Sequence, residues 1–446
     1  MQHFLLFLFL VLIVSCSPIT ESDWPNLPPL VGAWDEVVTF GGSQEDTAHN
    51  IISTNDGGFA VIGNTQSING DFSEKERAGS DFFVMKFNSA SVLEWTKTYG
   101  GSSDDRGYDL VELNTGGYAL IGYSKSNDGD ASLNQGQHDN WLLRIDAQGT
   151  LLWERSFGFL GHDHAYNILA TQDGGLFFNG FLDVTASNGA GQEGKQMHFN
   201  QRHGVGEFWC HKVDKNGNLV WRRYFGGTSN DRSYDAIETK EGDFVLVGAS
   251  ESQDVDISDP RGSYDAWIVK LDASGDLIWE HSFGGSNYDG AQAIIENRNG
   301  DYVILGQTYS SDGDIEKAMG SSDIFLAFFS KEGILKSSKT IGSEGFEKAN
   351  TLLERPDGTL VLVGHQASNK LNVEDSFLAN NVHLVHTLAN GSVMNTYSLD
   401  GNGLDLAFAI NEREDGKIQV VGSTESDAGD FPISRGGKDI FLAIWH

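Results

Sequence analysis

The sequence predicts an all-β fold, a seven-bladed β-propeller with four antiparallel strands in each blade. The first observation is a repeat: a glycine inside an apolar segment recurs at intervals of 59, 58, 68, 58, 58 and 58 residues. These glycines are Gly63, Gly122, Gly180, Gly248, Gly306, Gly364 and Gly422. The second observation is that no helical periodicity interrupts the short apolar segments. The third is that the two ends of the chain hold complementary parts of one repeat. Such repeats are typical of propellers.

The second repeat illustrates the four strands expected in each blade. We expect strands over 108–114 and 118–124 joined by a tight turn, then a long polar loop, then strands over 140–146 and 151–157. Turn pairs such as Asp-Gly and Asn-Gly between apolar segments are the strongest short hairpin signals. Because the strands are apolar almost throughout, both faces of each sheet should be covered by neighbouring sheets.

The two ends of the chain predict how the ring closes. The last segment, 439–445, matches the third strand of the seventh repeat, and no fourth strand follows it. The segment 34–40 precedes the first full repeat and has no partner there. Pairing these segments would remove two open sheet edges at once. An open solenoid would need capping repeats instead, and none is visible. We therefore expect the N-terminal strand to complete the last blade.

The N-terminus has the features of a lipoprotein signal peptide over residues 1–15. Its apolar segment, 4–14, would rise only about 16 Å as a helix, roughly half the hydrocarbon thickness of a bilayer. This length is typical of a signal peptide and not of a membrane span. The following Ile13-Val14-Ser15-Cys16 resembles the lipobox of bacterial lipoproteins. The resemblance implies that Cys16 is diacylated and begins the mature chain; ordinary secretion is the alternative.

Residues 16–33 are expected to tether the propeller, which spans 34–446, to the membrane. Four of the seven prolines lie in this segment, so it should be extended and semi-rigid. We expect an outer-membrane location. The cell surface is favoured over the periplasmic face, because Glu21 and Asp23 follow the cysteine as acidic export signals do in some Bacteroidota-type lipoproteins. If Cys16 is lipidated, only Cys210 remains, so no disulfide can form, and Cys210 should be a buried apolar side chain.

The repeat itself resembles those of bacterial, Bacteroidota-type lipoproteins and secreted proteins of the form GGS-x-x-D…DGGY-x-x-x-G…D-x-W-x-x-K-x-D-x-x-G…W. The resemblance covers Trp34 to His446. It implies a propeller and does not imply an activity.

Acidic residues recur in every repeat on the face that should carry the long loops. One set is Asp46, Asp105, Asp163, Asp231, Asp289, Glu347 and Asp405. A second set precedes the third strand and consists of Asp81, Asp139, Glu207, Asp265, Asp323, Asn381 and Asp439. A carboxylate ring or paired catalytic acids is one interpretation. The favoured one is architectural, because short polar side chains accept hydrogen bonds from turn backbone, whereas a catalytic site would break the symmetry.

The long loops hold alternating carboxylates that could bind calcium, an ion that takes six to eight oxygen ligands. They are Asp128-Gly129-Asp130, Asp254-Val255-Asp256, Asp312-Gly313-Asp314 and Asp427 with Asp430. None has the spacing of the twelve-residue calcium loop, so solvated acidic loops are the favoured interpretation. No other cofactor is expected.

The third repeat breaks the symmetry, because it is ten residues longer than the others and rich in histidine. Loops held by rigid blades commonly carry function. The candidate contacts to a partner or ligand are His162, Asp163, His164, His198, Arg202 and His203. Imidazoles beside Asp163 could also bind a transition metal. Flexible surface histidines are the commoner explanation.

Composition and motifs argue against several function classes. The net charge of −33, from 63 acidic and 30 basic residues, repels nucleic acid and anionic lipid. No HExxH, GxSxG or phosphate-binding loop is present. We therefore expect a protein without catalytic activity that binds or scaffolds other outer-membrane or surface proteins. The alternative is a surface protein that binds or processes carbohydrate; aromatic rings at the central mouth would favour glycan binding.

Overall fold

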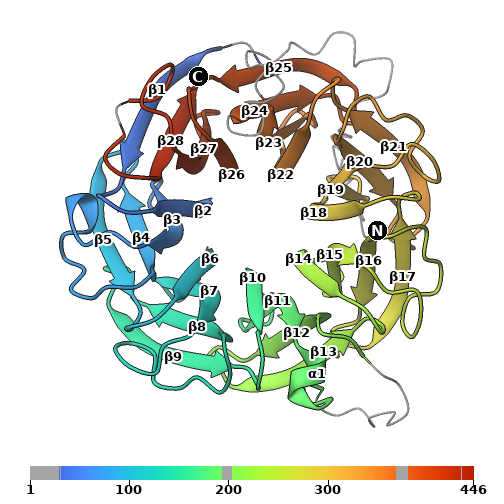
Figure 1. The fold of residues 1–446 in the computed structure, drawn as a ribbon, viewed down its shortest axis with the longest axis horizontal. Coiled ribbons are helices and arrows are strands. Elements are labelled where there is room, and N and C mark those ends of the chain that lie inside the picture. Colours follow the sequence, from blue (N-terminus) through green and yellow to red (C-terminus); the bar gives the residue numbers. More distant parts are fainter. Residues whose placement is uncertain (1–29, 31, 193–202, 368–379, 433) are drawn as a thin grey trace, which may run out of the picture.

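The computed structural model describes residues 30, 32–192, 203–367, 380–432 and 434–446. Seven four-stranded antiparallel sheets surround one central axis (Figure 1). The chain enters each of blades 1 to 6 at the innermost strand and leaves it at the outermost. The predicted seven-bladed propeller is confirmed.

The first four blades follow one another along the chain, with their strands in sequence order from the axis outward. Blade 1 contains β2 (Asp46–Ser53), β3 (Phe59–Thr65), β4 (Asp81–Phe87) and β5 (Leu93–Tyr99). Blade 2 contains β6 (Asp105–Glu112), β7 (Tyr118–Ser124), β8 (Asp139–Ile145) and β9 (Leu151–Phe157). Blade 3 contains β10 (His164–Ala170), β11 (Leu176–Leu182), β12 (Glu207–Val213) and β13 (Leu219–Phe225). Blade 4 contains β14 (Asp231–Glu238), β15 (Phe244–Ser250), β16 (Asp265–Leu271) and β17 (Leu277–Phe283).

The remaining three blades complete the ring. Blade 5 contains β18 (Asp289–Glu296), β19 (Tyr302–Thr308), β20 (Asp323–Phe329) and β21 (Leu335–Ile341). Blade 6 contains β22 (Glu347–Glu354), β23 (Leu360–Ala367), β24 (Asn380–Thr387) and β25 (Val393–Leu399). Blade 7 contains β26 (Asp405–Glu412), β27 (Ile418–Thr424), β28 (Asp439–Trp445) and β1 (Trp34–Phe40). Two short helices, η2 (Gly70–Phe72) and α1 (Val184–Ser187), lie in the loops of blades 1 and 3.

The N-terminal strand closes blade 7, as predicted. β1 pairs with β28 in antiparallel register from Trp34 opposite Trp445 to Phe40 opposite Ile440. Adjacent blades are joined by side-chain packing and by single parallel bridges, such as Glu45 with Lys438 between blades 1 and 7. Within the residues described, no helix has the length and hydrophobicity needed to cross a bilayer.

The core lies between the blades, which explains the apolar strands. All seven residues of β3, and likewise of β4, are buried. Phe82 of blade 1 packs edge to face on Trp141 of blade 2, with ring centroids 5.0 Å apart. Cys210 of β12 is fully buried in the core shared by blades 3 and 4, as the sequence predicts.

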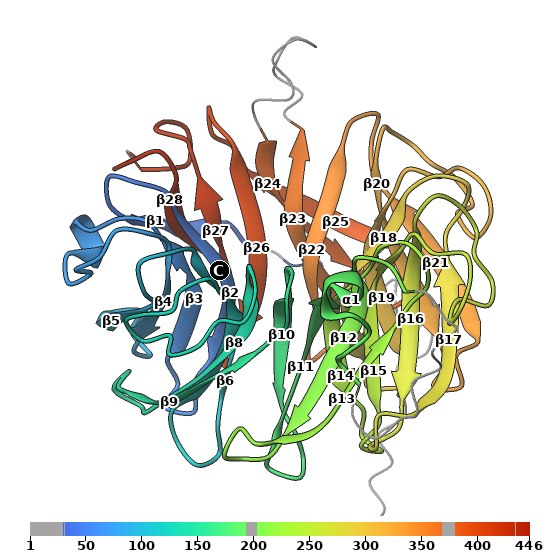
Figure 2. The ribbon, with the colours of Figure 1, turned by 60° about the horizontal axis from the view of Figure 1, so that its bottom comes forward.

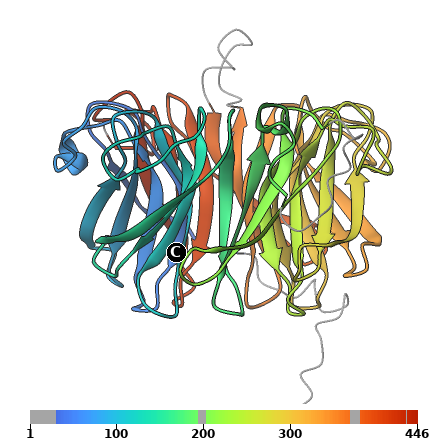
Figure 3. The ribbon, with the colours of Figure 1, turned by 90° about the horizontal axis from the view of Figure 1, so that it is seen from below.

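The strands run between two faces of the ring (Figures 2 and 3). One face, the turn face, carries the tight turns within each hairpin. The other, the loop face, carries the long loops that join the second and third strands of a blade, together with the connections between blades. This segregation agrees with the sequence interpretation and places the recurring acids on the loop face.

Candidate functional site

The first set of recurring acids is buried and holds the loop face together. Asp105 accepts hydrogen bonds from the backbone N–H of Gly101 (2.8 Å), from the Ser126 hydroxyl (2.7 Å) and from the Ser124 hydroxyl. Asp46, Asp231 and Asp405 likewise accept hydrogen bonds from two hydroxyl groups each. The architectural interpretation of this set explains these contacts, because each carboxylate ties an inter-blade connection to its own blade.

The second set of recurring acids lies where each long loop ends and the third strand of its blade begins. Asp139 accepts a hydrogen bond from the backbone N–H of Gln135 at 2.7 Å, and Asp439 does so from Arg435 at 2.6 Å. Burial raises the pKa of Asp139 to about 6 and that of Asp81 to about 7. In blade 6 the position is Asn381, so a neutral side chain also fills it.

The alternating carboxylates of each long loop accept hydrogen bonds from the connection between their own blade and the blade before it. Asp128 accepts a hydrogen bond from the Ser102 N–H at 2.7 Å, and Asp130 accepts one from Gly100 at 3.1 Å. In blade 4, Asp254 and Asp256 repeat this arrangement. These contacts account for the spacing of the acids without an ion.

Asp163 departs from its equivalents in the other blades. It accepts hydrogen bonds from the N–H groups of Phe159 (2.7 Å) and Asp183 (3.0 Å). The two positions that supply hydroxyl groups to Asp46, Asp105, Asp231 and Asp405 are occupied by Leu182 and Val184 here. Burial, together with the nearby Asp139, raises the pKa of Asp163 to about 8. The structure therefore places Asp163 in the interior and separates it from the two histidines that flank it in the sequence.

Those two histidines meet a third at the junction of blades 2 and 3. His162 lies exposed in the connection from β9, His164 begins β10, and His138 ends the loop before β8. The His138 Nδ1 lies 3.0 Å from the His162 Nδ1 and 3.0 Å from the His164 Nε2. We call these three residues the histidine cluster. Among the residues described, it is the one group of three metal-ligating side chains whose ligand atoms all lie within 4.8 Å of one another.

The surroundings of the histidine cluster fix its rings. Tyr123 stacks on His164, with ring centroids 4.0 Å apart, and lies 4.6 Å from His138. The Asp104 Oδ2 lies 3.9 Å from the His138 Nε2, and the Tyr166 hydroxyl lies 3.3 Å from the His164 Nδ1. Burial lowers the pKa of His138 to about 4 and that of His164 to about 3. Both imidazoles are therefore neutral at pH 7, the form in which imidazole binds metals.

Among the described residues, no other junction between blades repeats the histidine cluster. His138 and His162 form the parallel bridge that joins blades 2 and 3. The corresponding pairs elsewhere are Ser80 with Asp104, Gly206 with Asn230, Tyr264 with Tyr288, Ser322 with Phe346, Asn380 with Leu404, and Lys438 with Glu45. Because these six junctions form with unrelated side chains, the blade architecture does not require histidine here.

Of the other predicted contacts, His203 lies apart from the histidine cluster. The His203 Nδ1 lies 2.9 Å from the Glu207 Oε2, and the ring packs on Tyr224. His198 and Arg202 fall outside the residues that the structure describes. His138 is not among the contacts predicted from the sequence. It precedes the third strand of blade 2 by one residue, and only the bridge between blades brings it to His162.

Part of the long third-repeat loop is packed into the blade. The Trp209 Nε1–H donates to the Gly191 carbonyl at 3.0 Å, and the Thr185 N–H donates to the Gly204 carbonyl at 3.2 Å. Gly161 lies close against Ala186 of α1. We call residues 159–162, α1 and residues 203–206 the blade-3 cap. It presents Leu160 and Val205, which are 62% and 53% exposed.

An arc of aromatic rings follows the innermost strands around the axis. It comprises Phe408, His49, Tyr108, Tyr166 and Tyr234, which five consecutive blades supply from equivalent positions. Ring centroids lie 5.4 Å apart between Phe408 and His49, 4.6 Å between His49 and Tyr108, 5.0 Å between Tyr108 and Tyr166, and 5.7 Å between Tyr166 and Tyr234. The other two blades supply amides, Gln292 and Asn350. All seven side chains are half-buried.

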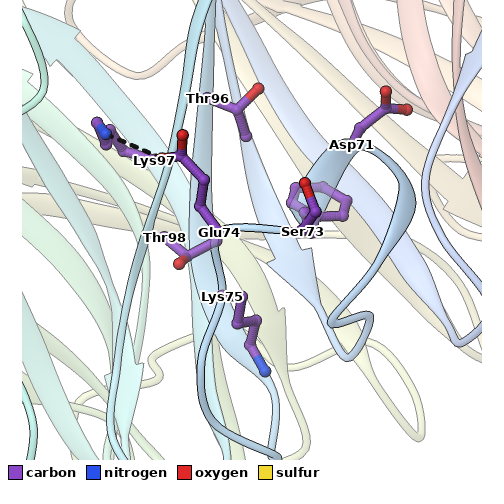
Figure 4. Close-up of a pocket in the computed structure, with 8 residues that line it drawn as sticks. Asp71, Ser73, Glu74, Lys75, Thr96, Lys97 and Thr98 are labelled. Atoms are coloured by element: carbon purple, nitrogen blue, oxygen red, sulfur yellow. Dashed lines mark hydrogen bonds and ion pairs between the residues drawn. The ribbon is translucent and has the colours of Figure 1, made fainter.

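Two concave regions lie in blade 1 and at its junction with blade 2. A cavity of about 620 Å³ on the loop face is lined by Ser43, Gln66, Ile68, Ser80 and Asp104, the last of which contacts His138. A smaller polar groove of about 350 Å³ lies between η2 and β5 (Figure 4). There Lys97 pairs with Glu74 at 3.2 Å, and both side chains are exposed.

Comparisons with known proteins assign no family to the chain. No protein-family model and no curated protein matches the chain. Among solved structures, the chain is similar to the β-propeller domain of the Trilobed protease from Pyrococcus furiosus, with a TM-score of 0.45 and 9% identity over 92% of this chain and 94% of that one. It is also similar to the α-L-arabinofuranosidase Arb93A from Fusarium graminearum, with a TM-score of 0.45 and 9% identity over 93% of this chain and 97% of that one. For Sqt1 from Chaetomium thermophilum the TM-score is 0.43, with 11% identity over 92% of this chain and 99% of that one.

Proposed function

We propose that this propeller is a lipid-anchored binding module without catalytic activity, which presents the loop face of blades 2 and 3 to other proteins of the outer membrane or cell surface. The observation that carries the proposal is the blade-3 cap. It departs from the repeat, and it exposes two large apolar side chains, of which Leu160 lies two residues before His162 of the histidine cluster. Leu160 and Val205 each adjoin a glycine that contacts α1, so they belong to one packed unit.

Charge and rigidity support this assignment. The recurring acids are engaged in holding the loop face, so the surface that varies is the surface free to recognise a partner. Exposed apolar patches rimmed by polar groups are typical of protein-binding surfaces, and Leu160 and Val205 are the large apolar side chains that the blade-3 cap exposes. The net charge of −33 favours a partner surface that is neutral or basic.

Substitution of the cap tests the proposal. The double variant Leu160→Asp, Val205→Asp should lose the proteins that co-purify with the wild type while its melting temperature stays unchanged, because both side chains are exposed. The matched control is Val92→Asp, Ile334→Asp, which places the same charges at side chains that are 59% and 65% exposed on the outer hairpins of blades 1 and 5. Retention of every partner by the cap variant would refute the proposal.

Carbohydrate binding is the second candidate function, and the aromatic arc favours it. Aromatic rings offer flat apolar faces, and the arc places five of them side by side around the axis. Binding of a glycan that survives the cap substitutions but is lost in Tyr166→Ala would support this candidate over the first.

Membrane attachment is tested separately through Cys16, which lies outside the described residues. Cys16→Ser should move the protein from the detergent-extracted outer-membrane fraction to a soluble or uncleaved form, because the acylated thiol is removed and stable anchoring needs more than one acyl chain. Cys210→Ser is the matched control, since it alters the other thiol of the chain. Unchanged partitioning of Cys16→Ser would show that Cys16 is not the anchor.

A further inference from the structure

We propose that His138, His162 and His164 bind one divalent first-row transition-metal ion, with Zn²⁺ the expected occupant and one coordination position open. The inference does not depend on the proposed function, because it rests on the geometry of the histidine cluster and not on a partner.

The spacing of the ring nitrogens suits a tetrahedral ion. Zinc–imidazole bonds of about 2.0–2.1 Å place two ligand nitrogens of a tetrahedral site roughly 3.3–3.4 Å apart. In the cluster, the His138 Nδ1 lies 3.0 Å from each of the other two nitrogens. The third separation, between His162 and His164, is no more than 4.8 Å. Binding would therefore lengthen the two distances from the His138 nitrogen by a few tenths of an ångström. His162, which is exposed, can move to shorten its distance to the His164 nitrogen.

The hydrogen-bonding pattern also favours a cation. A ring nitrogen either carries one hydrogen or offers one lone pair. The His138 Nδ1 faces two imidazole nitrogens at hydrogen-bond distance, so it can form a good hydrogen bond with only one of them. A metal ion would use a lone pair from each of the three nitrogens and would satisfy all three rings at once.

The neighbours of the cluster match the outer contacts of metal-binding histidines. Such histidines commonly place their second ring nitrogen near a carboxylate, a carbonyl or another polar group, which orients the ring. Here Asp104 lies near the far nitrogen of His138, at 3.9 Å, and the Tyr166 hydroxyl near that of His164, at 3.3 Å. Asp104 is in turn held by the Arg106 Nε–H, which donates to it at 3.0 Å. Two of the three ligands therefore have polar support.

Ligand chemistry selects the class of ion. Three imidazole nitrogens suit zinc, copper and nickel, whereas calcium and magnesium require oxygen ligands. Three protein ligands leave the fourth position of a tetrahedral zinc for water or for an added ligand. Because His162 is exposed, that position is accessible from the loop face, at the blade-3 cap to which His162 belongs.

The test is a zinc titration of the chelator-treated protein in competition with a chromogenic chelator. We expect one equivalent of Zn²⁺ to bind tightly, and Co²⁺ to give the visible absorption of a tetrahedral ion. His162→Ala, which removes a ligand, should weaken binding by at least about 10-fold. Asp104→Asn should weaken it by about 10-fold, the lower end of the 10- to 100-fold cost of losing an outer contact, because Asp104 lies 3.9 Å from His138. His162 is exposed, so its variant should unfold at the wild-type temperature when metal is absent.

Control measurements separate this site from weak binding elsewhere on an acidic protein. His281→Ala removes a half-buried histidine on the outer strand of blade 4 and should leave zinc binding unchanged. Excess Ca²⁺ should not displace Zn²⁺. The proposal fails if no stoichiometric equivalent binds, if His162→Ala and His138→Ala bind zinc as the wild type does, or if Ca²⁺ competes for the same equivalent.

Discussion

A chain that begins at Gly41, and so lacks β1, should melt about 3–7 °C below a chain that begins at Leu30, or should not unfold cooperatively at all. The reason is that β1 is the outermost strand of blade 7 and pairs with β28 along its whole length. Without β1, β28 becomes an open edge of a hydrophobic sheet, which is also a template for aggregation.

The apolar side chains of β1 set the size of this effect. Trp34 packs edge to face on Trp445 at 5.2 Å, and its Nε1–H donates to the Ser398 carbonyl at 3.0 Å. Val37, Val38 and Phe40 pack on the cores on either side of blade 7. Full burial of such a side chain contributes roughly 1.5–3 kcal/mol, and these four side chains are half-buried, so each contributes about half as much. Their sum is on the order of 3–6 kcal/mol, against a total of about 5–15 kcal/mol for a typical domain.

The two shortened chains are compared by calorimetry and by size-exclusion chromatography. Both lack residues 1–29, so the comparison isolates Leu30 to Phe40. Trp34→Ala in the longer chain should give an intermediate loss, because it removes one anchor and keeps the strand. Equal melting temperatures for the two chains would mean that the ring is held by contacts between blades alone.

The sequence predicts the blades well because each strand carries its own signals. The expected strand 118–124 matches β7, and 34–40 matches β1. The expected strand 108–114 instead runs from Asp105 to Glu112 as β6. Its polar start looks like loop, but Asp105 is drawn into the strand because its carboxylate binds the hydroxyl groups of Ser124 and Ser126 in the neighbouring strand and loop. A hydrogen bond to residues about twenty positions away leaves no local periodicity.

The candidate site is only partly predictable for a related reason. His162 and His164 stand out as departures from the repeat, and the alternation of side chains along a strand places Asp163 on the opposite side from both. His138 lies 24 positions before His162, and only the parallel bridge between blades 2 and 3 brings the two together. Alignment of the residues that precede the first and third strands of each repeat would have paired these positions.

Replacement by asparagine should destabilise the fold more at Asp105 than at the equivalent Asp163. Asp105→Asn should lower the free energy of unfolding by about 2–4 kcal/mol, because an amide places an N–H₂ group against surrounding donors and leaves buried groups unpaired. Asp105 receives two hydroxyl groups and the Gly101 N–H, and all of these are buried. Asp128→Asn, at a side chain whose hydrogen bond with Ser102 is exposed, is the control and should cost under about 1 kcal/mol.

Asp163→Asn should cost much less than Asp105→Asn at pH 7. Leu182 and Val184 replace the hydroxyl donors here, and burial raises the pKa of Asp163 to about 8, so the carboxyl is protonated in the folded protein and resembles an amide. In the unfolded chain its pKa is near 4, so the protonated form favours folding fully below pH 4, and this contribution is lost as the pH rises toward 8. An asparagine does not titrate. The melting temperature of Asp163→Asn should therefore rise relative to that of the wild type between pH 4 and pH 8, measured by thermal denaturation at matched ionic strength. A constant difference in melting temperature between Asp163→Asn and the wild type across this range would show that Asp163 is ionised in the fold. An equal loss of stability in Asp163→Asn and Asp105→Asn would show that the missing hydroxyl groups do not matter.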